Sequence, residues 1–79
     1  MTIQQFTYRP DMETIPVGTT VDWTNLDLVA HTVTSDTGVF DSGLLQNRGT
    51  CAITFTTPGT FAYHCTIHPA MVATIKVTG

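Results

Sequence analysis

The sequence has 79 residues, 42% of them hydrophobic and 11% charged, and six acidic side chains outnumber three basic ones to give a net charge of −3. A chain this short can bury one hydrophobic core, so residues 1–79 are predicted to form a single domain. Arg9, Arg48 and Lys76 are the only Arg and Lys residues, which argues against nucleic-acid binding because phosphate recognition needs clustered basic side chains. No apolar run approaches the about 18 residues that a membrane-spanning helix needs. The N-terminus does not read as a signal peptide, so an export signal has been removed or was never present.

Short segments with alternating side chains follow one another through the first half of the chain. "TIQQFTY" (Thr2–Tyr8) is predicted to form the first strand, and "TTVDWTN" (Thr19–Asn25) the second, with Val21 and Trp23 on one face. "HTVTSD" (His31–Asp36) follows a short polar turn and is predicted to be the third. Thr and Val favour strands, and no apolar period of 3.6 residues indicates a helix.

The second half of the chain shows the same alternation after a less regular segment. Residues 38–48 are predicted to be loop, with room for a turn of helix. "CAITFTT" from Cys51 and "TFAYHC" from Thr60 alternate on either side of a "TPGT" turn, and "MVATIKVTG" from Met71 supplies a last strand with Lys76 exposed. Strands at short intervals, separated by Gly and Pro, are typical of an all-β sandwich or a closely related barrel.

The stretch "YHCTIHPAM" brings together four side chains that can bind metal, namely His64, Cys65, His68 and Met71. Alternation from Tyr63 places Cys65 on the inward face of the strand and His64 on the outward face. The Pro in "TIHPAM" and the loss of alternation predict that the strand ends at Cys65. His68 and Met71 therefore lie on a loop that can curl back over the sulfur of Cys65.

A further donor is available in His31, which begins "HTVTSD" and is predicted to lie at the same end of the sandwich. Two imidazoles, one thiolate and a weak axial thioether are the ligand set associated with copper that cycles between Cu(I) and Cu(II). Structural zinc sites rarely use Met, and catalytic zinc sites keep an open position for water. Met71 therefore favours copper, although a Met on an apolar loop can also serve packing alone.

The order of these residues resembles the cupredoxins, or type 1 blue copper proteins, of the plastocyanin and amicyanin branch. "VGTTVDWTN" precedes the first His and "FTTPGTFAYHC" runs into "CTIHPAM", whose Cys-x₂-His-x₂-Met spacing is more similar to amicyanin than to plastocyanin. The resemblance covers nearly the whole chain and implies a Greek-key β-sandwich that transfers electrons. It also implies one copper ion bound by His31, Cys65, His68 and Met71. Thr32 differs from the Asn that the family often has after the first ligand.

Cys51 alternates with Ile53 and Phe55 and is predicted to face inward, where a buried thiol packs as a small hydrophobic side chain. An alternative is a disulfide with Cys65, because a plain hairpin at "TPGT" would place the two cysteines opposite each other. The resemblance implies instead that this turn crosses between two sheets. The two interpretations exclude each other, because a disulfide would remove the thiolate ligand.

His64 is predicted to point away from the ligands, at a position where the family often has an aromatic residue. Either it is a solvent-exposed histidine with no special role, or it is a surface relay position covalently adjacent to Cys65. His68 is predicted to offer its outer edge to solvent. Pro69 and Ala70 beside it form a small apolar rim, which is the candidate docking surface and suits transient contact with a redox partner.

The predicted function is transfer of single electrons between a redox donor protein and a redox acceptor protein. No His has a triad partner by motif and protein donors fill the copper site, so an enzyme is not expected. Two alternatives stay open: a copper-carrying or copper-buffering protein, and an interaction module whose copper or zinc only stabilises the fold. A monomer in the periplasm or outside the cell is expected.

Overall fold

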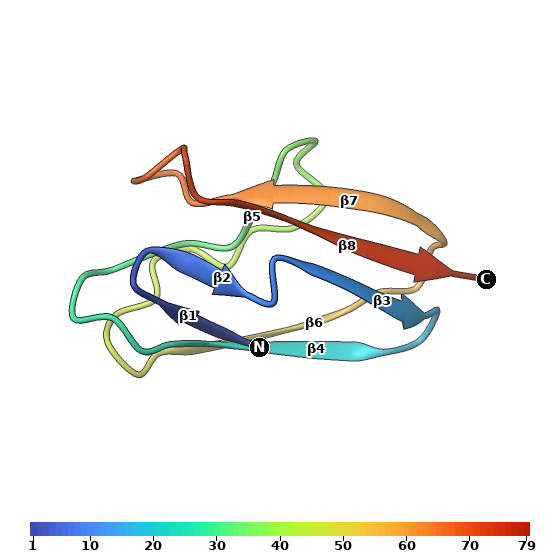
Figure 1. Ribbon diagram of the computed structural model, residues 1–79. Helices are drawn as coiled ribbons and strands as arrows, with labels where there is room; N and C mark the ends of the chain where they lie inside the picture. Colours follow the sequence, from blue (N-terminus) through green and yellow to red (C-terminus); the bar gives the residue numbers. More distant parts are fainter.

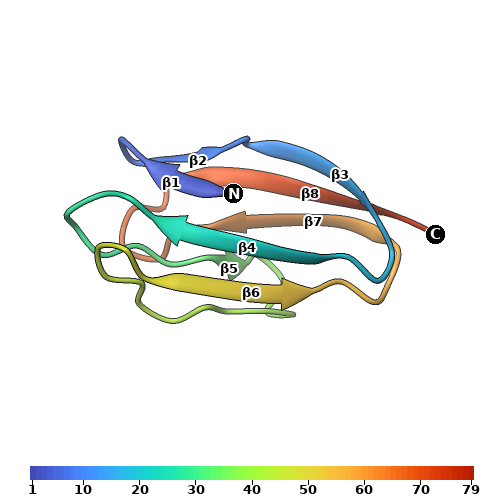
Figure 2. The same ribbon diagram turned by 90° about the horizontal axis from the view of Figure 1, so that it is seen from below.

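The computed structural model describes residues 1–79, and all of its regular structure is β-strand. The eight strands are β1 (Thr2–Gln4), β2 (Thr7–Arg9), β3 (Met12–Pro16), β4 (Thr20–Asn25), β5 (Thr34–Ser35), β6 (Thr50–Thr54), β7 (Gly59–His64) and β8 (Val72–Thr78). They form two four-stranded sheets, in the orders β2-β1-β4-β6 and β3-β8-β7-β5. Figures 1 and 2 show the sheets as the two layers of a sandwich. The predicted all-β sandwich is confirmed.

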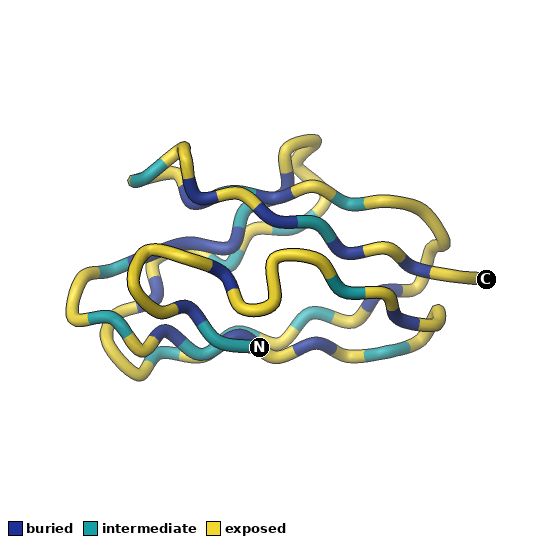
Figure 3. Tube along the Cα trace, viewed as in Figure 1, coloured by how far each residue is buried: buried dark blue, intermediate teal, exposed yellow.

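Inward-facing side chains of both sheets form one core. Val21 and Trp23 of β4 are buried and alternate with exposed or half-buried neighbours, and Ala73, Ile75 and Val77 of β8 are buried in the same alternating way. Figure 3 shows this pattern as buried segments that recur along the strands. A period of two is expected where one face of a sheet packs on a core and the other faces water.

Aromatic rings connect this core to the end of the sandwich where the metal-binding motif lies. The ring of Tyr63 packs nearly edge-on against Trp23, at 5.6 Å between centroids, and against Tyr8, at 4.7 Å. The Tyr8 hydroxyl donates to the main-chain carbonyl of Thr32, the residue after His31. Burial raises the pKa of both phenols, that of Tyr63 to about 12, so both remain hydrogen-bond donors at neutral pH.

The prediction of one continuous strand over Thr2–Tyr8 is wrong. The chain makes a tight turn at Gln5 and Phe6, which have φ values of 55° and 57°, and β1 then pairs antiparallel with β2. Ile3 and Tyr8 are both buried in the core. Side chains an odd number of residues apart face opposite sides of a single strand, so burial of this pair requires the turn.

Two other segments differ from expectation. β3 was not predicted, because Ile15 is its only buried residue and alternation is therefore weak. His31 lies before β5 and not within a strand, and its main chain forms an isolated bridge with Leu45. Residues 38–48 form a loop as predicted, without a helical turn. The structure has no helix with the length and hydropathy that a membrane span requires.

The connections determine which segments meet at each end of the sandwich. β6 and β7 belong to different sheets, so the "TPGT" turn between them crosses from one sheet to the other, as the resemblance implied. The β1–β2 turn, the β4–β5 link and the loop between β7 and β8 all lie at the end drawn on the left in Figures 1 and 2, while the C-terminus lies at the opposite end.

Candidate metal centre

Three metal-binding side chains from two separated parts of the chain meet at this end of the sandwich. His31 comes from the β4–β5 link, Cys65 follows β7 directly, and His68 lies on the loop before β8. Their donor atoms all lie within 4.8 Å of one another. His31 and Cys65 are fully buried, while His68 is partly exposed. The structure therefore brings together three of the four residues predicted as ligands in a single cluster of donor atoms.

The distances between the donor atoms fit a shared metal ion. The Sγ atom of Cys65 lies 3.7 Å from Nδ1 of His31 and 3.8 Å from Nδ1 of His68. Metal bonds of about 2.1 Å to imidazole nitrogen and about 2.3 Å to thiolate sulfur, at an angle of about 120°, place the two donors about 3.8 Å apart. Because the set combines a soft thiolate with two imidazoles, it suits copper better than a hard cation such as Mg²⁺.

Main-chain hydrogen bonds fix Cys65 and close the loop that follows it. The amide of Thr32 donates to Sγ of Cys65 at 3.4 Å. The amide of Cys65 donates to the carbonyl of Met71 at 3.2 Å, and the amide of Met71 donates to the carbonyl of His68 at 2.9 Å. Met71 is buried, with an exposed fraction of 6%, and packs in the core at the end of this loop. The loop thus returns to the main chain of Cys65.

The side chain of Thr32, in the β4–β5 link just before β5, also contacts this loop. Its Oγ1 accepts a hydrogen bond from the amide of Thr66 at 2.9 Å and lies 3.4 Å from the Thr66 hydroxyl. These two threonines directly follow His31 and Cys65 in the sequence, so the bond ties the two ligand-bearing segments together. A threonine hydroxyl therefore connects the segments at the position where the resembling family often has Asn.

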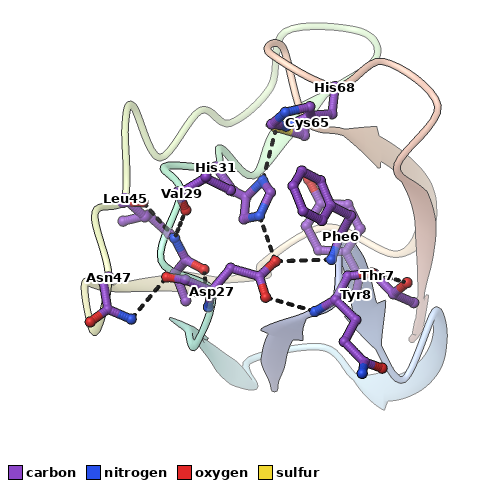
Figure 4. Close-up of polar contacts among 12 residues, drawn as sticks. Phe6, Thr7, Tyr8, Asp27, Val29, His31, Leu45, Asn47, Cys65 and His68 are labelled. Carbon is purple, nitrogen blue, oxygen red and sulfur yellow. Dashed lines mark hydrogen bonds and ion pairs between the residues drawn. The ribbon is translucent and has the colours of Figure 1, made fainter.

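Sequence patterns did not reveal the residue that holds the ring of His31. Nε2 of His31 donates to Oδ2 of Asp27 at 2.7 Å, which leaves Nδ1 directed towards Cys65 (Figure 4). The amide of Asp27 in turn donates to Oδ1 of the buried Asn25 at 2.9 Å. Burial raises the pKa of Asp27, but hydrogen bonds from two main-chain amides and from His31 outweigh it and lower the pKa below its usual range. Asp27 stands four residues before His31, a spacing that signals contact only in a helix.

Cys51 and His64 lie outside the donor cluster. Both cysteines are free thiols, with Cys51 half-buried on β6 in the sheet opposite Cys65, so the alternative of a disulfide is wrong. Burial, and then the charges of two nearby aspartates, raise the pKa of Cys51. His64 points away from Cys65 as predicted, and its Nδ1 lies 2.6 Å from Oδ1 of Asp36 at the surface.

Comparison with known proteins relates the whole chain to copper proteins. A family model described as copper binding proteins of the plastocyanin/azurin family matches residues 1–78. Amicyanin from Paracoccus denitrificans is 34% identical over 68 residues, which cover 80% of this chain and 52% of amicyanin. Amicyanin-alpha from Methylorubrum extorquens is 35% identical over 68 residues, which cover 80% of this chain and 57% of the relative. The chain spans about half the length of these curated relatives.

Solved structures agree with this relationship at the level of the fold. Two amicyanin mutants, one in an oxidised state and one in a Cu(I) form, each match with a TM-score of 0.92 at 30% sequence identity. Each match covers 98% of this chain and 78% of the solved chain. The similarity therefore includes the end of the sandwich that carries the donor cluster.

Proposed function

This chain belongs to the plastocyanin/azurin family of copper-binding proteins, and from that premise we propose that it carries single electrons between redox partners, with residues 1–79 as one copper-binding domain. The observation that supports this function is the meeting of one thiolate and two imidazole nitrogens at separations suited to one metal ion. Copper bound there supplies a one-electron couple between Cu(I) and Cu(II).

The proposed ligands are His31, Cys65, His68 and Met71. Support for the first three is the clustering of their donor atoms. Support for Met71 is its burial at the end of the ligand loop, where its main chain hydrogen-bonds to Cys65 and His68. A thioether is a weak axial donor in copper sites and rare in structural zinc sites, so this fourth residue favours copper.

The protein frame holds these donors in one arrangement. The carboxylate of Asp27 orients the ring of His31, and the amide of Thr32 is aimed at the sulfur of Cys65. Both ligands are buried on a close-packed core, so their side chains have little room to rearrange when an electron arrives or leaves. Little rearrangement means fast electron exchange. Cys65 also directly follows β7, so the main chain provides a covalent path from this ligand into the sheet.

His68 is the proposed point of electron entry and exit. Its side chain is partly exposed, and Pro69 and Ala70 beside it are exposed. This small apolar rim suits weak and transient contact with a redox protein, because a carrier has to leave one partner before it meets the next. The donor and the acceptor therefore dock here in turn, and the chain works as a monomer.

The same reasoning makes this chain a carrier and not an enzyme. Four protein donors leave no coordination position at which a substrate could bind. The proposed compartment is the periplasm or the exterior of the cell, because a copper–thiolate site near the surface suits an oxidising environment better than a cytosol rich in competing thiols.

Addition of Cu(II) to the metal-free protein, followed by visible absorption and EPR spectroscopy, tests this function. We expect intense blue colour and a reversible midpoint potential in the wild-type protein and in Cys51→Ser, and neither in Cys65→Ser, because only the second thiol is a ligand. Met71→Leu should stay blue with a shifted potential, since the axial donor is weak. A colourless protein that binds Cu(I) tightly but resists oxidation would identify a copper carrier. Zinc in the isolated protein, without redox response, would identify a structural module.

A further inference from the structure

The turn between β1 and β2 adopts a conformation that its residues do not favour on their own. Gln5 and Phe6 both have positive φ values, 55° and 57°, in the left-handed region that Gly and Asn prefer in two-residue hairpin turns. A carboxylate compensates for this. The amide of Gln5 donates to Oδ1 of Asp27 at 2.7 Å, and the amide of Phe6 donates to Oδ2 at 2.9 Å. One side chain on the β4–β5 link therefore holds the tip of the hairpin (Figure 4).

The same carboxylate contacts the proposed copper ligand His31. Oδ2 of Asp27 accepts from Nε2 of His31 at 2.7 Å, in addition to the amide of Phe6. The main chain of Asp27 is itself held on both sides, since its amide donates to Asn25 and its carbonyl accepts from Nδ2 of Asn47 at 2.8 Å. Asp27 thus joins the hairpin tip and the imidazole through one fixed group.

The ring of Phe6 lies against both imidazoles of the donor cluster. Its centroid is 5.1 Å from that of His31 and 4.8 Å from that of His68, and it stands nearly perpendicular to both rings, at 83° and 84°. Phe6 is 48% exposed whereas His31 is fully buried. Figure 4 shows the half-exposed ring of Phe6 beside the buried imidazole of His31.

We propose that Asp27 is a positioning residue with two linked tasks: it orients His31 towards the metal, and it holds Phe6 as a cover that keeps small ligands away from the metal. The cover presupposes the copper binding proposed above, but not electron transfer. Phe6 then determines which molecules can reach the site, and Asp27 determines whether Phe6 stays in place. A ligand-orienting hydrogen bond and a solvent barrier are both known means of tuning a metal site.

The metal-free protein tests, without any copper, whether Asp27 holds the hairpin tip and Phe6 in place. In Asp27→Ala we expect the amides of Gln5 and Phe6 to exchange hydrogen about tenfold faster or more, because their acceptor is gone. In Phe6→Ala these amides should remain protected. In a Cys51→Ser background, however, Phe6→Ala should increase the alkylation rate of Cys65 about tenfold, because access to a buried thiol limits its reaction.

The copper-loaded protein tests the cover with azide as the probe. In Phe6→Ala, EPR titration should give an azide affinity about tenfold higher than in the wild type, with the starting copper spectrum little changed. Asp27→Ala should raise the azide affinity as well and should also change the copper hyperfine splitting, because the orientation of His31 is lost. Leu28→Ala is the matched control, since Leu28 is a 90% exposed apolar residue on the same link.

Two results would overturn this assignment. One is equal protection of the hairpin amides in Asp27→Ala and wild type; the other is a Phe6→Ala variant whose Cys65 and azide reactions match those of Leu28→Ala. Asp27→Asn keeps the shape of the side chain and one acceptor oxygen, so it serves if the alanine variant does not fold, and it should lose protection at one or both amides. If the protein forms no blue copper site, the amide and alkylation results still decide whether Asp27 holds the hairpin tip and whether Phe6 covers Cys65.

Discussion

Replacement of Thr32 with Val isolates the hydroxyl that ties the two ligand-bearing segments together. Val has nearly the same shape as Thr, so the change removes the hydrogen bond from the Thr66 amide at 2.9 Å, together with the contacts of this hydroxyl with the hydroxyls of Thr34 at 2.9 Å and Thr66 at 3.4 Å. The neighbouring Thr34 hydroxyl keeps Asp41 as a partner at 3.1 Å. An intramolecular hydrogen bond contributes about 0.5–1.5 kcal/mol, and water can reach the exposed Thr66, so we expect a loss of about 1 kcal/mol. In a domain of this size that lowers Tm by about 4–8 °C.

Thermal unfolding of the metal-free protein measures this loss, and hydrogen exchange at the Thr66 amide assigns its cause. Thr32→Ser is the matched control because it keeps the hydroxyl but removes a methyl group from a buried position. Its stability should fall by a similar amount, about 1 kcal/mol, through lost apolar burial. Only the Val variant should lose protection at the Thr66 amide. An amide that stays protected in Thr32→Val would refute the brace, whatever happens to Tm.

Three further outcomes follow from burial, titration and surface pairing. Ile75→Ala, in the centre of the core, should lower the free energy of unfolding by about 2–5 kcal/mol, whereas exposed Val72→Ala should change it by less than about 0.5 kcal/mol, as urea unfolding can measure. In Cys65→Ser, the remaining Cys51 has a raised pKa, so its thiolate fraction is low at neutral pH. Its alkylation should therefore accelerate with pH beyond the ordinary thiol value of about 8.5. His64→Ala should leave the blue absorption unchanged and stability within about 1 kcal/mol, because its contact with Asp36 lies at the surface.

For each of these three predictions, a specific experimental result would contradict the reasoning or decide between the alternatives. Equal effects of the two β8 substitutions would mean that the core is not packed as the alternation indicates. Alkylation of Cys51 that levels off below about pH 8.5 would contradict its raised pKa. For His64, a slower reaction with a redox partner at unchanged absorption would support the relay, and an unchanged rate would leave an ordinary surface histidine.

Local alternation predicted how side chains point at the end of β7 and directly after it, and contacts between distant segments supplied the rest of the site. The inward Cys65 and outward His64 follow from the period of two along β7, which depends on neighbouring residues alone. The hairpin at Gln5 and Phe6 could not be predicted in this way, because its acceptor, Asp27, lies more than twenty residues further along the chain. Gly or Asn would have signalled the turn, and neither is present there.

The donor cluster is held more firmly on one side than on the other, and this difference predicts where metal binding affects the protein. His31 and Cys65 lie on the close-packed core. The ring of His31 is already bonded to Asp27, and the sulfur of Cys65 to the amide of Thr32. His68 lies on a partly exposed loop whose closure depends on two main-chain hydrogen bonds and on Thr32. A metal shared by all three would therefore restrict the loop and the Phe6 cover more than the sandwich beneath them. Since a ligand stabilises only the states that bind it, copper should slow local opening at this end before it changes exchange in the core strands.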